Sequence, residues 1–82
     1  MPYVSQERRP DLDKLVNHMR HTLKFDGDLN YVLFALCRRA VPLSYNNIKN
    51  FIGELNECAA EIRRRILANH EDRKCEDNGD VW

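Results

Sequence analysis

The sequence predicts an all-α protein: a three-helix bundle of two short helices and one long C-terminal helix, assembled as a dimer. Two observations lead to the helical class. Apolar residues recur at helical spacings of three and four through three successive segments. The 82 residues include only three Gly and three Pro, and 32% are charged, a balance typical of helical proteins. Few positions in the chain are therefore able to break a helix.

The first two helices are expected to be short. The first begins near Pro10, because proline suits a first helical turn. In the second, the carboxylate of Asp26 or of Asp28 can cap the N-terminus, and Pro42 forces the chain out of the helix. Their apolar stripes are Leu12, Leu15, Val16, Met19 and Leu23 in the first helix, and Leu29, Val32, Leu33, Leu36 and Ala40 in the second.

The third helix is expected to be the longest. Ser44 is a good N-cap, and an apolar residue then follows every three or four positions until Asn69 interrupts the pattern. We call these residues the apolar seam: Ile48, Ile52, Leu55, Ala59, Ile62 and Ile66. A continuous helix from Tyr45 to about Asn69 is roughly 37 Å long at 1.5 Å per residue, about twice the length of either of the others.

This mismatch in length predicts a homodimer. The two short helices cover only part of the long one in an antiparallel bundle, so its C-terminal half is left open. Closed two-fold homodimers are the commonest soluble oligomers, which makes a second copy the economical cover. A monomer whose tail folds back over this half is the alternative. The interface candidates are Ile52, Leu55, Ala59, Ile62, Ile66, Leu67 and Trp82.

All 82 residues are expected to form a single helical domain, with an extended N-terminal arm over residues 1–9 and a tail over residues 70–82 that packs back. The Asp-Asn-Gly sequence at residues 77–79 favours a turn, because Asn and Gly accept positive φ. Such a turn would return Val81 and Trp82 to apolar surface left by the shorter helices. Trp82 is therefore predicted to be substantially buried on its own or a partner subunit.

Composition and charge argue against several classes of function. Thirteen basic and thirteen acidic side chains give a formal net charge of zero, so no overall field draws the protein to nucleic acid or an anionic membrane. No segment approaches the roughly 18 apolar residues of a membrane span, and no secretory signal is recognisable. The three cysteines include no C-x-x-C pair, which suits reduced thiols. The sequence therefore predicts a cytoplasmic location and no membrane contact.

One group of acids could serve an enzyme. Glu54 and Glu57 are three residues apart and Glu61 lies one turn further on, so a helix could direct their carboxylates at a divalent metal. The helical nucleotide pyrophosphohydrolases use such an E-x-x-E pair with a later E-x-x-D pair, which this chain echoes only loosely. The His and Cys residues match no zinc spacing. A divalent-metal-dependent nucleotide hydrolase is thus a minor alternative, and no cofactor, metal or catalytic residue is predicted.

Two arginine clusters suggest a second alternative, nucleic-acid binding. The clusters are Arg38 with Arg39, and Arg63 with Arg64 and Arg65. Consecutive helical residues point about 100° apart, so three in a row do not form one flat patch. Glu57 and Glu61 also lie within pairing distance of the second cluster. A solvated outer face is the preferred interpretation, and nucleic acid is not an expected partner.

Four segments carry a resemblance to a known family. They are GDLNYV at residues 27–32, LSYNNIKNFIGELNECA at 43–59, RRRILANHEDRK at 63–74 and NGDVW at 78–82. The chain resembles a small bacterial and phage-associated family of uncharacterised proteins, in which a G-[DE]-L-N-Y segment leads through an E-C-A helix to an arginine pair, an E-D-x-K segment and a closing E-N-G-D-V-Y. Trp82 replaces the usual Tyr, and one acidic position is shifted at residues 76–77. The resemblance implies that the ending is a family feature, and it brings no activity or cofactor.

The sequence therefore favours a small accessory or scaffold protein that acts through contacts between helices, homo-oligomeric ones and ones with a protein partner. Neither kind of contact requires a catalytic centre.

Overall fold

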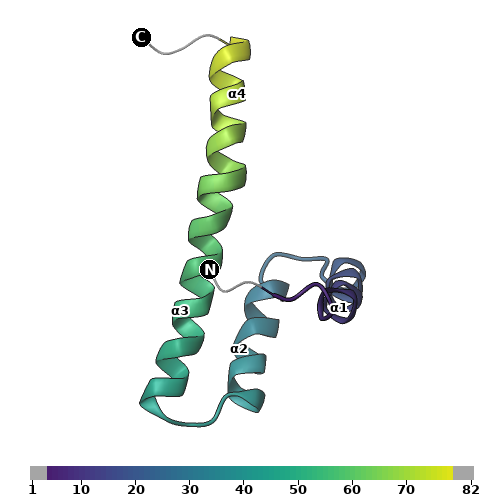
Figure 1. The fold of residues 1–82 in the computed structure, drawn as a ribbon, viewed down its shortest axis with the longest axis vertical. Coiled ribbons are helices and arrows are strands. Elements are labelled where there is room, and N and C mark those ends of the chain that lie inside the picture. Colours follow the sequence, from purple (N-terminus) through teal and green to yellow (C-terminus); the bar gives the residue numbers. More distant parts are fainter. Residues whose placement is uncertain (1–3, 79–82) are drawn as a thin grey trace. The chain divides into compact units, whose positions relative to one another are not determined.

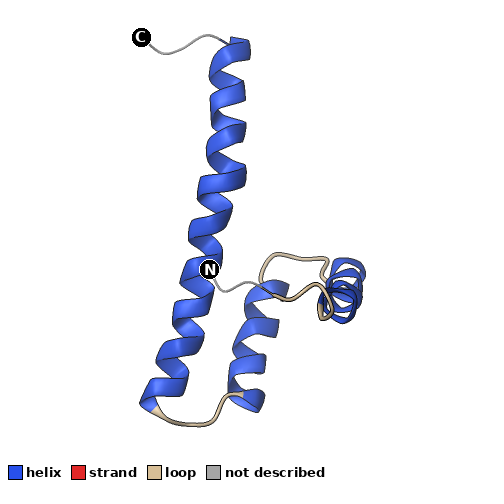
Figure 2. Cartoon of the chain, viewed as in Figure 1, coloured by secondary structure: helices blue, strands red, loops and turns tan. Residues whose placement is uncertain are grey.

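The computed structural model describes residues 4–78 of the chain, and every regular element among them is helical (Figures 1 and 2). The elements are α1 (Arg9–Thr22), α2 (Asp28–Ala40), α3 (Tyr45–Ile62), the π-helical turn η1 (Arg63–Leu67) and α4 (Ala68–Asn78). Since α3, η1 and α4 follow one another without a break, we call them together the long helix. The predicted all-α class, with two short helices before a long one, is confirmed.

The chain divides into two compact units. The first, Met1–Leu43, contains α1 and α2, and the second, Ser44–Trp82, contains the long helix. None of the helices within residues 4–78 is long and apolar enough to cross a membrane.

A turn leads the chain into α1. The backbone N–H of Arg8 donates to the Ser5 carbonyl at 3.1 Å, and Pro10 lies in the first helical turn, as expected. At the other end, the hydroxyl of Thr22 donates to the His18 carbonyl at 2.7 Å. The carbonyl four residues back is the usual acceptor of a threonine hydroxyl within a helix.

The connection between α1 and α2 is organised by Gly27 and Asp28. Gly27 precedes α2 with φ of +93°, in the left-handed region that favours glycine. The Asp28 carboxylate accepts hydrogen bonds from the backbone N–H groups of Lys24 at 2.8 Å and Phe25 at 2.9 Å. The predicted cap was therefore wrong: no side chain caps α2. Asp28 is already the first helical residue, so its carboxylate reaches back to the connection.

Replacing Gly27 by Ala is expected to lower the free energy of unfolding by about 1–2 kcal/mol, the cost of a left-handed backbone for a residue with a Cβ. The matched control is Gly53→Ala inside α3. At both positions an added Cβ would meet no atom within 4 Å, so the two variants differ in backbone conformation and not in steric room. Gly53→Ala should stabilise by about 0.5–1 kcal/mol. Equal effects of both variants in urea unfolding would argue against this role for Gly27.

The backbone N–H of Lys24, and then that of Phe25, hold the pKa of Asp28 below its ordinary value of 3.8. Because the folded-state pKa is lowered, the stabilisation is present above pH 3.8 and is lost as the pH falls through the lowered pKa. An NMR titration of the Asp28 carboxyl should give a midpoint below 3.8. In Asp28→Asn, the amide signals of Lys24 and Phe25 should lose this acid transition. A midpoint at or above 3.8 in the native chain would contradict the two bonds.

Ser44 caps α3 as predicted. Its backbone is extended, with φ of −143° and ψ of 154°, and its hydroxyl oxygen accepts from the Asn47 N–H at 3.2 Å. The Ser44 carbonyl accepts from the Ile48 N–H at 3.0 Å, which begins the helical ladder. The side chain thus satisfies one of the donors that a helix leaves free at its start.

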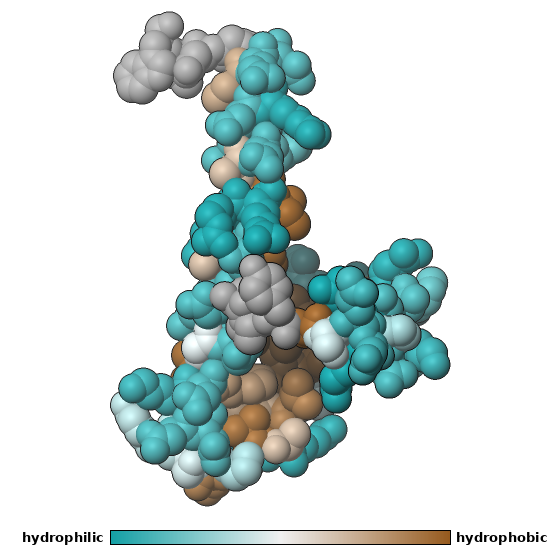
Figure 3. Space-filling model, in the orientation of Figure 1, coloured by the Kyte–Doolittle hydropathy of each residue, from teal (hydrophilic) through white to brown (hydrophobic). Residues whose placement is uncertain are grey.

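The long helix continues to Asn78, so the end expected near Asn69 was wrong. Residues 68–78 contain no Gly or Pro that would break the helix, and they continue it without an apolar face. On the face shown in Figure 3, α4 is covered mainly by hydrophilic side chains. Residues 77 and 78 are helical as well, whereas Gly79, Val81 and Trp82 lie outside the described residues. The expected return of the tail stays a prediction.

Candidate interaction surface on the long helix

The apolar seam lies open along the long helix. The exposed fractions are 51% for Ile52, 36% for Leu55, 49% for Ile62, 65% for Ile66 and 45% for the neighbouring Leu67, whereas Ile48 and Ala59 are half-buried. Across residues 4–77, no side chain is fully buried. None of the predicted interface residues in this range is therefore fully buried. Trp82 lies outside the described residues.

The N-terminal end of the seam forms a shallow apolar concavity. Tyr45, Ile48, Lys49 and Ile52 line it. The Lys49 ammonium lies 5.9 Å from the centre of the Tyr45 ring, within the range of a cation–π contact. The ring and the aliphatic side chains thus make a hollow of the size and polarity that suit an apolar side chain from another helix.

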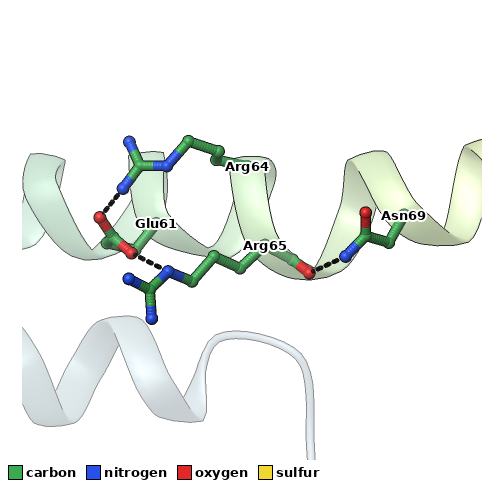
Figure 4. A network of polar contacts seen from close by, with 4 residues as sticks. All are labelled: Glu61, Arg64, Arg65 and Asn69. Atoms are coloured by element: carbon green, nitrogen blue, oxygen red, sulfur yellow. Dashed lines mark hydrogen bonds and ion pairs between the residues drawn. The ribbon is translucent and has the colours of Figure 1, made fainter.

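A polar network lies at the junction of α3, η1 and α4 (Figure 4). Glu61 forms ion pairs with Arg64 and Arg65. The Arg65 Nε lies 2.8 Å from Glu61 Oε2, although its N–H is not directed for a hydrogen bond. The Asn69 side-chain amide donates to the Arg65 carbonyl at 2.7 Å. The side chain of Glu61 is only 14% exposed, so water solvates its charge poorly. The two guanidinium groups at close range balance that charge.

The π-helical turn ends the seam. The Ala68 N–H donates to the Arg63 carbonyl, five residues back instead of the usual four. The wider turn holds one extra residue, which rotates α4 relative to the seam by about 100°. Asn69 supplies a side-chain donor where the backbone ladder is disturbed. Sequence reasoning missed this turn because residues 63–67 contain no helix breaker. Only Asn69, which interrupts the apolar pattern, indicated a change in the helix near this point.

Most arginines of the two clusters interact with their own helix. Arg38 and Arg39 occupy the last turn of α2, where positive charge stabilises the negative end of the helix dipole. Arg64 and Arg65 pair with Glu61. Four of the five arginines in the two clusters thus have a role inside their own helix. This arrangement favours a solvated outer face over a nucleic-acid interface.

Glu54, Glu57 and Glu61 are the residues that the sequence offers for a metal centre. In the part of the chain that the structure describes, no three side chains of His, Cys, Asp or Glu come together as a metal site requires. Glu61, the third member of the set with Glu54 and Glu57, is held by two arginines. The geometry therefore gives the nucleotide hydrolase alternative no support.

Comparison with known proteins places the whole helical chain in one family. No curated protein and no solved structure matches it. A family model does match, and it spans nearly all of both units. Residues 1–81 match the model described as Domain of unknown function (DUF6899), and the chain belongs to that family.

Proposed function

We propose that the protein is a small cytoplasmic accessory or scaffold protein of bacterial or phage-associated origin, which works as a homodimer along the long helix. Each chain acts as a single domain, and the dimer binds a protein partner through helix contacts. The half-exposed seam from Ile52 to Ile66 supports this proposal, because surface of this kind on a helix is normally covered by another helix.

The exposure of the seam carries the proposal. Ile52, Ile62 and Ile66 recur on one face of the long helix and expose 51%, 49% and 65% of their surface. A continuous apolar stripe of this length marks a site of contact with another helix, and a second copy supplies an identical stripe.

A test of the homodimer is copurification of two differently tagged copies. We expect chains carrying a His tag and a Strep tag, expressed together, to elute from the second affinity column in equal amounts. Mixing of the separately purified chains should give the same complex after subunit exchange. Recovery of one tag without the other in both formats would refute the homodimer.

Trp82 is proposed to anchor the tail against apolar surface of its own or the second chain. It is the single tryptophan of the sequence, so intrinsic fluorescence reports on it alone. We expect its emission maximum to lie well to the blue of free tryptophan and to move to the red in urea, since an apolar site shields the indole from water. Deleting Val81 and Trp82 should lower the melting temperature. Emission like that of free tryptophan in the native protein, with an unchanged melting temperature after deletion, would show a free tail.

A further inference from the structure

The apolar seam reads almost the same in both directions. Its steps are four, three, four, three and four residues, and its side chains are Ile, Ile, Leu, Ala, Ile and Ile. The centre of this pattern falls at Glu57. A second long helix turned end for end about Glu57 therefore brings every seam residue opposite another seam residue.

We propose that the two long helices of the dimer run antiparallel, with the two-fold axis passing between them at the level of Glu57. This inference rests on the homodimer proposed above and specifies its orientation and register. It pairs Ile48 with Ile66 of the second copy, Ile52 with Ile62, and Leu55 with Ala59. Six apolar layers are formed, and the helix dipoles oppose each other.

The charges of α4 favour this orientation over a parallel one. In a parallel pair in register, each side chain faces its own copy. Continuing the seam into α4 would then set Arg73 against Arg73 and Glu76 against Glu76. If the π-helical turn shifts the phase by one residue, the facing pairs become Lys74 with Lys74 and Asp77 with Asp77. Both phases place like charges opposite each other in the seam, where they repel.

The antiparallel register removes these contacts. Position for position, α4 from His70 onward lies opposite residues that precede Tyr45 of the second copy, so it extends past the start of the other long helix. A helix without an apolar face suits such a position. In this register the cationic side chain of Lys49 approaches the residues around Arg63 of the second copy. In that copy, Arg64 and Arg65 are already paired with Glu61.

Side-chain size points to the same register. Leu55 and Ala59 flank the centre of the seam, so the antiparallel pair sets a large residue against a small one on both sides of the axis. Facing positions that alternate large and small interdigitate without voids. In a parallel pair, Ala59 would face Ala59 and leave a gap, and Leu55 would face Leu55.

Distances between spin labels test the orientation. Each variant keeps or introduces one cysteine, with the other native cysteines, out of Cys37, Cys58 and Cys75, replaced by Ser. At 1.5 Å per residue, the axial separation across the antiparallel dimer is about 54 Å for Cys75, 36 Å for Asn69→Cys and 24 Å for Lys49→Cys. In a parallel dimer in register, all three separations lie within about 25 Å, two helix diameters.

The possible outcomes separate this inference from the homodimer itself. Circular dichroism and solution mass are measured on every labelled sample, so that only folded chains are compared. Separations that grow with distance from residue 57 support the proposal. A dimer with three equal short separations overturns the antiparallel orientation. A dimer whose separations increase from a centre other than residue 57 overturns the register. A folded monomer would instead refute the homodimer.

Discussion

Replacing Ile62 by Glu is expected to raise the dissociation constant of the dimer at least 100-fold. Ile62 lies in the exposed seam and is predicted to face Ile52 of a second copy. The substitution places a carboxylate in each of two apolar layers, and an unpaired charge there costs several kcal/mol. A loss of about 2.7 kcal/mol already corresponds to a factor of 100. Sedimentation velocity over a concentration series measures the effect.

The matched control is Ala60→Glu. It adds the same charge to the same helix, but two residues rotate the side chain by about 200°, away from the seam. Ala60 is exposed, and its replacement should change the dissociation constant by less than about threefold, as is usual for a surface substitution. Native-like dimerisation of Ile62→Glu would mean that the seam is not the interface.

Exchanging Leu55 and Ala59 is expected to restore a dimer that each single substitution weakens. Leu55→Ala removes apolar volume at two sites per dimer, and each such loss costs about 2–5 kcal/mol in a well-packed core. Ala59→Leu overpacks the same layers at about 1–3 kcal/mol. The double variant again sets a large residue against a small one across the axis. Its dissociation constant should lie within about tenfold of the native value.

The double-mutant cycle distinguishes the two orientations. In an antiparallel dimer about Glu57, the two substitutions meet in one layer and compensate, so the coupling energy is large. In a parallel dimer they lie in separate layers that each face themselves, and their effects would add. Additive losses in dissociation constant would therefore count against the antiparallel register. The measurement is the dissociation constant of all four proteins under one set of conditions.

The sequence predicts the helices well where the signal is local. The spacing of apolar residues located all three helices, and the hydroxyl of Ser44 identified the start of α3, because capping depends on residues three apart. The cap of α2 failed for a related reason. Asp28 lies one position inside the helix, so its carboxylate binds N–H groups before the helix. The identity of a capping residue depends on where the first turn begins.

The end of the long helix shows why an apolar pattern can mislead. The seam stops at Ile66, but the backbone stays helical to Asn78 because residues 67–78 include no Gly or Pro. The π-helical turn between them depends on competition among nearly equal backbone hydrogen bonds, which residue spacing does not encode. The candidate surface itself was predictable, since two short helices cannot cover the whole apolar seam of a helix about twice their length.

The mass of the unmodified chain in solution tests the central claim most directly. Sedimentation equilibrium at low micromolar concentration should give about 19 kDa, twice the 9.7 kDa of one chain, because we propose that a second copy covers the exposed seam. The value should fall toward that of one chain only on strong dilution. A mass of 9.7 kDa throughout the micromolar range would contradict the homodimer.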